Sequence, residues 1–462
     1  MLIPLLLTAL PVLSADTVPA SAVDILGDLI DGSPYVGVLA DPAPAEVSYG
    51  APGLLGRPVG MATNAPEESV ASLVSDVPDG RAFTVYAAMP FPGEGLPGLP
   101  THQVDEPAEL GFTRSELERA EQVVSDGVRR EEFPGAALAI GRWNHTAVER
   151  GFGTLNGLPG SPSVDPDYAI YDLASLTKVI ATTTAVMLLY EDGRIDLDAP
   201  VSRYLPGFEG PGKDAVTIRH LLTHTSGLPA GGDTSGPTTT ASLWKAISTP
   251  LKTRPGEKVE YSDIGFITLW AAAESAYGAP LVDLLHQRVF EPLNMRMTSF
   301  RPGESCIRCA PTAERPGFRG VVHDPTARSL GGIAGNAGLF STVHDLSLFA
   351  AMLANRGELN GVRIFRPETI DVFTARQPGA GVRALGWETP APSGTGAGGL
   401  RISSTAFGHT GFTGTSMWVD PQRGTWVVLL TNRTYESGPN RMQELRRALN
   451  DSVAIAVDQT SD

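Results

Sequence analysis

Strand-like segments lie at both ends of the main part of this sequence, and helix-like segments lie between them. Apolar segments at 136–140 and 146–152 flank a short polar turn, which is typical of a hairpin. Two further apolar segments, 415–419 and 425–430, are joined by a Pro- and Gly-containing turn at 420–424. This order predicts an α+β fold (an α/β sandwich), in which an antiparallel sheet is flanked by helices and an all-helical subdomain lies beside it.

Apolar residues at helical spacing mark the segments between and after these strands. The first expected helix opens with a Thr-x-x-Glu capping box at 113–116 and ends near Pro134. The most apolar helix covers 177–191 and is closed by Gly193. The other expected helices cover residues 218–223, 264–277, 281–290 and 442–457.

The N-terminus has the pattern of an export signal. Residues 2–13 are apolar, and residues 20–22 read Ala-Ser-Ala, the small-x-small arrangement of a cleavage site. We therefore expect a signal peptide over 1–22 and a secreted or periplasmic (extracytoplasmic) protein. Because a charged n-region is missing, cleavage after Ala15 and a short buried helix or strand remain alternatives. No later stretch reaches the ~18 apolar residues that span a bilayer, so no transmembrane segment is expected.

Residues 23–108 differ from the rest of the chain because they are rich in Pro, Gly, Ala and acidic residues. Strand-like pieces occur at 35–39 and 83–86, and a Pro/Gly tract at 91–100 reads as a linker. This segment contains no constellation of chemical groups, and its role stays open. The predicted main domain covers 109–458.

The charge of the chain argues against a polyanionic partner. Lys and Arg total 35 against 51 Asp and Glu, which gives a formal net charge of −16. Nucleic acid would be repelled by this field, and no Lys/Arg run offsets it. We therefore expect no binding of nucleic acid.

Ser175 and Lys178 form a Ser-x-x-Lys pattern at the start of the most apolar helix. Positions i and i+3 share one face of a helix, so the ammonium lies one turn from the hydroxyl. The helix N-terminus also directs free N–H groups and the positive end of its dipole toward charge that develops near Ser175. The pattern therefore offers a nucleophile, a proton acceptor or charge stabiliser, and half an oxyanion hole.

A second Ser-x-x-Lys pattern, from Ser242 to Lys245, shows that the spacing alone is not specific. It follows a Thr-, Gly- and Pro-rich loop and has no long apolar helix behind it. We interpret Ser242 as a helix cap or an exposed serine.

Two motifs downstream of Ser175 give its pattern a context. Tyr261-Ser262-Asp263 lies at a loop-to-helix junction, and Gly408-His409-Thr410-Gly411 leads into a strand. In this order the three motifs resemble those of the serine β-lactamase and penicillin-binding-protein superfamily, in its class C β-lactamase-like branch. The resemblance covers about residues 110–455 and implies an active site between the sheet and the helical subdomain.

The resemblance implies a role for each matching residue. Ser175 would be the acylated nucleophile, and Lys178 would help to deprotonate it and balance charge. Tyr261 would relay protons as general base and then general acid. The oxyanion hole would use the backbone N–H groups of Ser175 and Phe412. The family has no metal and no cofactor, so none is expected here.

Two positions depart from the class C pattern. Asp263 stands where those β-lactamases have Asn; it can pair with Lys178 but cannot donate an amide hydrogen bond to a β-lactam side chain. His409 stands where the third motif normally begins with Lys, so attraction for a substrate carboxylate is weakened. Thr410 and Gly411 keep the rest of that motif. Both departures argue against an efficient antibiotic-hydrolysing β-lactamase.

Other residues allow more than one interpretation. His220 and His224 have a spacing that can bind metal, but packing and loop hydrogen bonding are the simpler interpretation. His323 could line the cleft or make a loop contact. Cys306 and Cys309 could form a local disulfide, remain free thiols or, with two further ligands, bind zinc.

We therefore predict an exported serine hydrolase that forms an acyl-serine intermediate on an ester or amide, most simply an ester. The first alternative is a D-amino-acid peptidase or carboxypeptidase, or a weak β-lactamase, acting on peptidoglycan-like substrates. A faint similarity of 33–35 and the 83–86 strand to the tail of family-3 glycoside hydrolases would favour such a wall substrate. The second is a catalytically decayed binding module. The partner is thus a small-molecule or peptide acyl substrate, and the oligomeric state stays open.

Overall fold

The computed structural model describes residues 36–41, 72–76, 82–87, 106–313, 317–435 and 440–458. The chain divides into two compact units, Met1–Leu99 and Pro100–Asp462. The first unit contains a three-stranded antiparallel sheet in the order β1-β3-β2, with β1 at Val36–Asp41, β2 at Ser72–Asp76 and β3 at Ala82–Ala87.

The sequence predicted β1 and β3, and both predictions are confirmed, whereas β2 was not expected. The predicted signal peptide (1–22) and the linker (91–100) lie outside the described residues.

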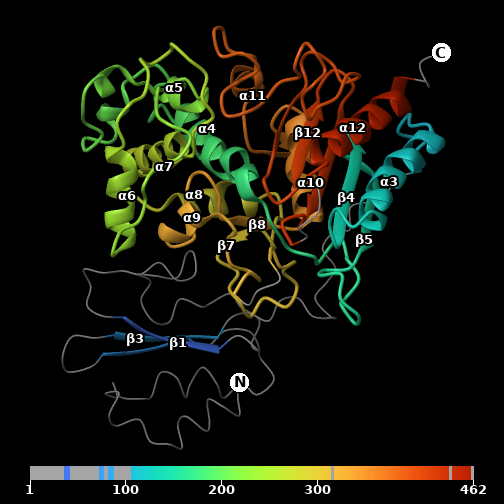
Figure 1. The fold of residues 1–462 in the computed structure, drawn as a ribbon, viewed down its shortest axis with the longest axis horizontal. Coiled ribbons are helices and arrows are strands. Elements are labelled where there is room, and N and C mark those ends of the chain that lie inside the picture. Colours follow the sequence, from blue (N-terminus) through green and yellow to red (C-terminus); the bar gives the residue numbers. More distant parts are fainter. Residues whose placement is uncertain are drawn as a thin grey trace, which may run out of the picture. The chain divides into compact units, whose positions relative to one another are not determined.

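A five-stranded antiparallel sheet forms the frame of the second unit (Figure 1). Its strands are, in spatial order, β11 (Phe407–Thr410), β12 (Ser416–Asp420), β13 (Thr425–Thr431), β4 (Gly135–Arg142) and β5 (His145–Gly153). The pairing of β13 with β4 joins strands from the two ends of the domain in one open sheet. The sequence predicted an antiparallel sheet built from strands at both ends.

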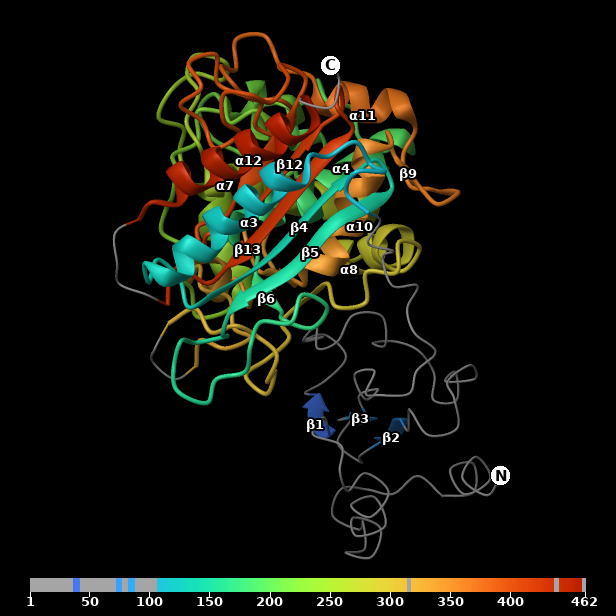
Figure 2. The ribbon, with the colours of Figure 1, turned by 90° about the vertical axis from the view of Figure 1, so that its right-hand side faces the viewer.

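Helices cover both faces of this sheet. Figure 2 shows α3 (Arg114–Arg129) and α12 (Met442–Asp458) side by side across one face, and α10 (Val343–Ala354) packs on the other. Because helices lie on both sides, β12 and β13 are buried along their whole length. The core under α3 and α12 includes Leu117, Val124, Leu138, Ile140, Leu429, Leu445 and Val453.

The remaining helices form the helical part of the domain, drawn in green to orange in Figure 1. They are α4 (Thr184–Glu191), α5 (Ile218–Leu222), α6 (Thr239–Ser248), α7 (Asp263–Tyr277), α8 (Leu281–Leu285), α9 (Pro325–Ser329) and α11 (Pro367–Thr374). Short 3-10 turns lie at Val201–Arg203 and Lys213–Ala215. The predicted α+β fold, with a sheet, flanking helices and a helical part, is confirmed.

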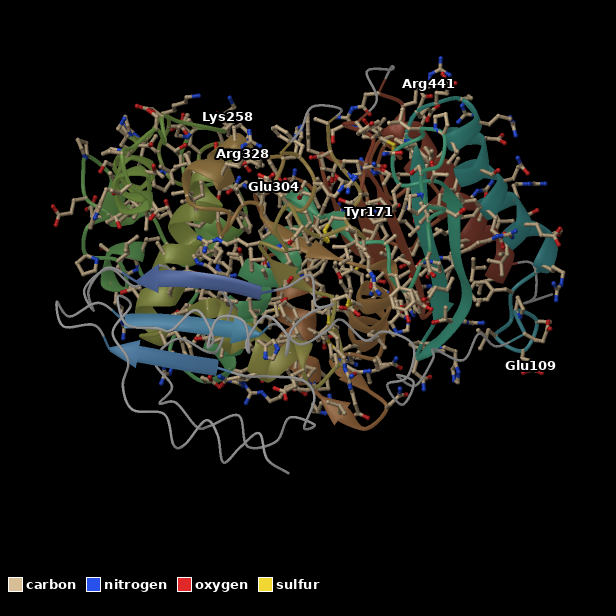
Figure 3. All side chains as sticks on the ribbon, turned by 90° about the horizontal axis from the view of Figure 1, so that it is seen from below. Glu109, Tyr171, Lys258, Glu304, Arg328 and Arg441 are labelled. Atoms are coloured by element: carbon tan, nitrogen blue, oxygen red, sulfur yellow. A yellow bond between two sulfur atoms is a disulfide. The ribbon has the colours of Figure 1, made fainter. Side chains whose placement is uncertain are left out.

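Two small sheets complete the second unit. The short sheet β6-β8-β7 pairs β6 (Tyr171–Asp172) and β7 (Ser299–Phe300) with β8 (Leu339–Ser341), while β9 (Glu358–Leu359) pairs with β10 (Val362–Arg363). Figure 3 shows Glu109 and Arg441 at the periphery, whereas Tyr171 of β6 is fully buried.

Some local predictions were wrong in detail. Thr113 precedes α3, but its side chain makes no capping hydrogen bond. The helix expected over 177–191 begins with a π-helical turn at Lys178–Thr183, and the one expected over 281–290 ends in another at His286–Phe290. In the first turn Thr183 Oγ1 donates to the Lys178 carbonyl, five residues earlier. Side-chain hydrogen bonds of this kind compete with the α-helical ladder, and periodicity does not show them.

Cys306 and Cys309 form a disulfide, which resolves the alternatives left by the sequence. In the described part of the chain, no helix has the length and apolar character needed to cross a bilayer.

Candidate active site

Ser175 follows directly after strand β6, in a tight turn. Ala174 has a φ of +48°, the left-handed region, and its N–H donates to Asp172 Oδ1 at 2.9 Å. Thr415 Oγ1 donates to the Leu173 carbonyl at 3.0 Å, so this turn is attached to the strand region that follows the third motif. A strained residue held by neighbours on both sides fixes the position of the next side chain. Ser175 is partly exposed, as a nucleophile must be.

Lys178 is fully buried, and its ammonium contacts three groups. Its Nζ donates to Ser175 Oγ at 3.1 Å and to the Asn336 carbonyl at 2.9 Å, and it lies 2.7 Å from Asp263 Oδ1. Burial lowers the pKa of Lys178, but the charges of Tyr261 and Asp263 and their hydrogen bonds outweigh burial and raise it. Lys178 is therefore a cation that donates to the serine oxygen.

Tyr261 is placed by the start of α7. Ser262 caps this helix by accepting the Gly265 N–H at 2.9 Å, and its hydroxyl donates to the Pro229 carbonyl at 2.6 Å. With the backbone held at Ser262, the Tyr261 ring lies 4.9 Å from Lys178 Nζ. Tyr261, which is far from Ser175 and Lys178 in the sequence, is thus brought to the same ammonium.

Two buried histidines flank Tyr261. The His224 ring lies 4.4 Å from the Tyr261 ring, and its Nδ1 accepts the Ser262 N–H at 3.0 Å. The His409 ring stacks at 6.1 Å, and its Nδ1 donates to the Thr410 carbonyl at 2.9 Å. Burial, together with nearby cations, holds the pKa of each histidine well below its usual range, so both are neutral near pH 7.

Arg383 is a site residue that sequence reasoning missed. Its guanidinium carbon lies 5.4 Å from the Tyr261 ring centre, and Nη1 lies 3.6 Å from Glu388 Oε2. Glu388 is bridged through its backbone both to Arg383 and to Gly408, the residue before His409. Arg383 lies in a loop without a motif, so only this bridge to β11 brings it into the site.

The end of the third motif approaches Ser175 closely. A Cβ on Gly411 would lie 2.0 Å from Thr415 Oγ1 and 2.5 Å from the Leu173 carbonyl, so a side chain there would displace the serine turn. Arg446 Nη2 donates to the carbonyls of Gly411 and Thr415, both at 2.9 Å. The next residue, Phe412, is 63% exposed. This arrangement places the Phe412 backbone beside the turn that carries Ser175.

Phe412 also forms an aromatic contact at the edge of the site. Its ring stacks on His323 at 5.7 Å, and the Arg433 guanidinium lies 4.8 Å from the ring centre. The His323 N–H donates to Asp172 Oδ2 at 2.6 Å. Of the two alternatives for His323, the structure therefore shows a residue that contacts both β6 and Phe412.

The second Ser-x-x-Lys pattern lies elsewhere and differs from its predicted form. Ser242 is fully buried within α6, so its interpretation as a cap or exposed serine is wrong; the cap is Thr238. Lys245 Nζ pairs with Asp233 at 2.9 Å. His220 Nδ1 accepts the Thr217 N–H at 3.1 Å, as part of the capping box at the start of α5.

Comparison with known proteins identifies the family of this chain. The Beta-lactamase family profile matches residues 120–451. A protein of Salmonella schwarzengrund (strain CVM19633) named "Putative D-alanyl-D-alanine carboxypeptidase" is 30% identical over 374 residues, covering 72% of this chain and 86% of that protein. A Salmonella typhi protein of the same name has the same identity and coverage.

Solved structures share the fold. A penicillin-binding protein homologue from Caulobacter crescentus matches with a TM-score of 0.62 at 20% identity, covering 75% of this chain and 99% of that chain. EstCE1, a hydrolase with promiscuous acyltransferase activity, matches with a TM-score of 0.60 at 24% identity, covering 73% and 99%. The profile match over most of the chain confirms the resemblance read from the three motifs: the chain belongs to the beta-lactamase family of serine hydrolases.

Proposed function

We propose that this chain hydrolyses a peptide with a free C-terminal carboxylate, of the D-alanyl-D-alanine class, through an acyl-Ser175 intermediate. The observation that carries the proposal is the position of Lys178 Nζ, 3.1 Å from Ser175 Oγ and 2.7 Å from Asp263. A serine hydroxyl is a weak nucleophile on its own and needs such neighbours to react.

The charge on Lys178 decides which residue accepts the serine proton. Because the ammonium donates to Ser175 Oγ, the hydroxyl proton is directed to another acceptor, and we assign that role to the Tyr261 oxygen. The Ser175 oxygen then bonds to the substrate carbonyl carbon while the C–N bond breaks, and Tyr261 returns the proton to the leaving amine. Water cleaves the resulting ester by the reverse proton path.

Two oxygens carry negative charge in this step, one before and one after the proton moves. To accept the serine proton, Tyr261 acts in its phenolate form, which would be stabilised by Lys178 and Arg383, the two cations that flank its ring. The negative charge that then develops on the substrate carbonyl oxygen would be stabilised by the backbone N–H groups of Ser175 and Phe412. Electrostatic stabilisation of this kind acts strongly in a site where the cations are already fixed.

Arg383 supports a substrate that ends in a carboxylate. His409 is neutral, so it does not supply the positive charge that Lys provides at this position in class C β-lactamases. Arg383 lies beside the same tyrosine, and a guanidinium can bind a carboxylate through two hydrogen bonds. The names of the two Salmonella relatives support the same substrate class.

An ester substrate is the second candidate, and the Phe412 surface favours it. Phe412 is exposed and stacked on His323, which offers an aromatic contact to an apolar acyl or alcohol group. A neutral ester has no carboxylate for Arg383 to bind, so the two substrate classes differ in how their KM depends on this residue.

Export also stays part of the proposal. The apolar run at 2–13 and the small residues at 20–22 are its basis in the sequence. The Cys306–Cys309 disulfide supports it, because disulfides persist in oxidising compartments and are rare in the cytosol.

Labelling of the nucleophile tests the acyl-serine step. The intact protein is treated with a fluorophosphonate or a penicillin probe, and the modified peptide is identified by mass spectrometry. We expect the label on Ser175, its loss in Ser175→Ala and its retention in Ser242→Ala, the matched control from the second Ser-x-x-Lys pattern. Failure of both probes to label the intact protein would support the decayed binding module instead.

A comparison of three substrates tests whether Arg383 binds the C-terminal carboxylate of the substrate. We expect Arg383→Gln to raise KM at least about tenfold for an acyl-D-Ala-D-Ala peptide, since one charge-assisted contact contributes more than ~1.4 kcal/mol. The KM for the same peptide as its C-terminal amide, and for a p-nitrophenyl ester, should change much less, whereas kcat can fall on all three substrates because Arg383 also lies beside Tyr261. An equal rise of KM on all three substrates would contradict carboxylate recognition by Arg383.

A further inference from the structure

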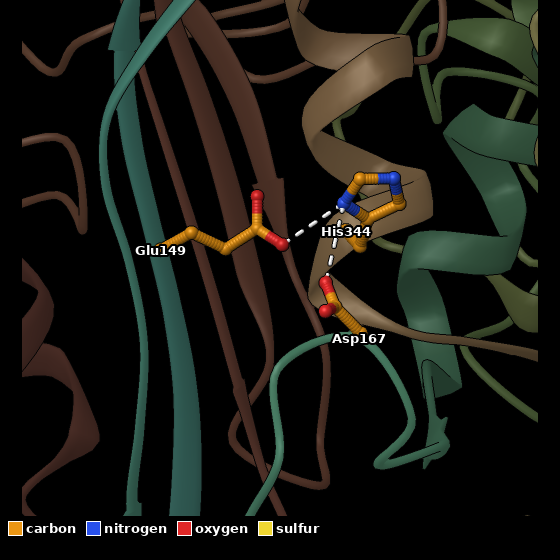
Figure 4. A group of neighbouring side chains, drawn as sticks. All are labelled: Glu149, Asp167 and His344. Carbon is orange, nitrogen blue, oxygen red and sulfur yellow. Dashed lines mark hydrogen bonds and ion pairs between the residues drawn. The ribbon is translucent and has the colours of Figure 1, made fainter. Parts of the chain in front are cut away.

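Three side chains on different segments converge on one another (Figure 4). Glu149 lies on β5, Asp167 on the loop before β6, and His344 in the first turn of α10. His344 Nδ1 lies 2.9 Å from Glu149 Oε1 and 3.5 Å from Asp167 Oδ1. All three groups offer a ligand atom within 4.8 Å of one another.

These separations fit one metal ion between the three atoms. Zinc binds imidazole nitrogen and carboxylate oxygen at about 2.0–2.2 Å, so two tetrahedral ligand atoms lie roughly 3.4 Å apart. The distances of 2.9 and 3.5 Å from His344 Nδ1 lie on either side of this value. The three ligand atoms all lie within 4.8 Å of one another, so the carboxylates would have to move inward by up to about 1 Å to bind one ion.

A second observation points to a ligand. The Glu149 side chain is only 7% exposed, and its Oε2 has no hydrogen-bond partner among the described residues. An unsatisfied buried carboxylate oxygen is costly, and a cation beside it would remove that cost.

We propose that Glu149, Asp167 and His344 bind a divalent transition-metal ion, with zinc as the best-fitting ion and water as its fourth ligand. The mixed nitrogen and oxygen donor set favours zinc over magnesium or calcium, which prefer oxygen alone. Asp167 is 53% exposed, which gives the ion a path from solvent.

The carboxylate of Asp345, the residue after His344, already accepts hydrogen bonds and is not one of the proposed zinc ligands. Its Oδ2 accepts the Met297 N–H and the Thr298 hydroxyl, both at 2.7 Å.

The ion would join three segments, one of which leads into the Ser175 turn. Asp167 comes shortly before β6, and β6 carries Asp172, whose side chain holds the Ala174 and His323 N–H groups. Zinc would therefore stabilise the segment that enters the Ser175 turn without touching the reacting atoms. The spacing of the ligands along the chain is too wide for any sequence motif to reveal them.

Metal binding to the full chain, without an affinity tag and with the disulfide intact, tests the proposal. After chelator treatment and its removal, zinc chloride is titrated at pH 7.5 by isothermal titration calorimetry. We expect one ion per chain with micromolar or tighter affinity, and a melting temperature that rises by a few degrees on binding. Cobalt(II) should give visible absorption bands of a low-coordinate nitrogen and oxygen site.

Two variants separate this site from adventitious binding. Asp167→Asn removes one exposed ligand and should weaken zinc binding about tenfold or more, with loss of the cobalt bands. Asp214→Asn, the same change at an exposed carboxylate elsewhere, should bind zinc as the intact protein does. If the intact protein binds no zinc, or Asp167→Asn binds it unchanged, the cluster is only a histidine–carboxylate ion pair and the proposal fails.

Discussion

The ammonium of Lys178 is fully buried and lies 2.7 Å from the carboxylate of Asp263, which is one-third exposed. In class C β-lactamases an asparagine amide stands at this place, so the exchange puts a full negative charge beside the lysine. The charge keeps Lys178 protonated, and a protonated lysine donates to Ser175 Oγ rather than accepting its proton. The proton-relay role therefore rests with Tyr261.

Replacing Asp263 with Asn should weaken this arrangement and move its pH range. Without this counter-ion, Tyr261 is left to offset the burial that lowers the pKa of Lys178, so the alkaline limb of kcat should move to lower pH. Removing one partner of a buried pair costs about 3–5 kcal/mol, and partial exposure of Asp263 reduces this to about 2 kcal/mol.

Urea unfolding and a kcat–pH profile measure both effects. The pKa of Lys178 is raised in the folded protein, so the stability from this pair is complete below the unfolded value of about 10.5 and is lost above it. Unfolding curves at pH 7 should therefore show the full difference between Asp263→Asn and the unmodified chain. An unchanged alkaline limb would contradict the charge-holding role.

Tyr261→Phe removes one oxygen and keeps the ring against His224. We expect kcat to fall by about 10²–10⁴, the usual contribution of a positioned acid–base group. The melting temperature should stay nearly the same, because the ring packing at 4.4 Å is preserved. A kcat within twofold of the unmodified enzyme would show that another group carries the proton.

Four of the five strands of the main sheet and several helices could be predicted, because their apolar residues are continuous or repeat with the period of the element. β4, β12 and β13 are continuous apolar segments bounded by turns, and they occupy the expected ranges. The π-helical turn at Lys178–Thr183 could not be predicted, because its apolar content is the same as that of an α-helix. The capping pattern at Thr113 predicted the start of α3 correctly, but the Thr113 side chain does not form the expected hydrogen bond.

The site was predictable where residues sit in motifs and not where loops converge. Ser175, Lys178 and Tyr261 were found by their spacing and order. Arg383 could not be found, because its place depends on the backbone bridges of Glu388 to β11. His224 was interpreted as packing, and its pattern gave no sign that it packs on the candidate proton relay.

Arg383 already places positive charge near the neutral His409. We therefore predict that a lysine at position 409 destabilises the folded protein. His409 is 2% exposed, and both Arg383 and Lys178 already place positive charge near it. His409→Lys would add a third cation in a buried site. We expect it to be about 2–4 kcal/mol less stable than His409→Gln, which is neutral.

A double-mutant cycle with Arg383→Gln isolates this repulsion. His409→Lys should cost less stability when Arg383 is absent, with a coupling energy of about 1 kcal/mol or more by urea unfolding. Additive effects would mean that the charges at positions 383 and 409 do not interact. The proposal that Arg383 supplies the positive charge that Lys provides at position 409 in class C β-lactamases would then lose its basis.

The lowered pKa of His409 should also appear as a pH dependence of stability. In the unfolded chain the imidazole takes up a proton below about pH 6.5, whereas in the folded chain burial and the cations Arg383 and Lys178 keep it neutral. The unfolded state therefore binds more protons, and stability falls as pH decreases from 6.5 to 5. Asp172 and Asp345 act in the opposite sense, because burial raises the pKa of each to about 6.

The difference in stability between the unmodified chain and His409→Gln removes the contribution of these two carboxylates. That difference should change by up to about 1.4 kcal/mol per pH unit below pH 6, measured by urea unfolding at several pH values. Parallel stability curves would show that His409 is protonated in the folded protein, and a charged histidine could then bind the substrate carboxylate in place of Arg383.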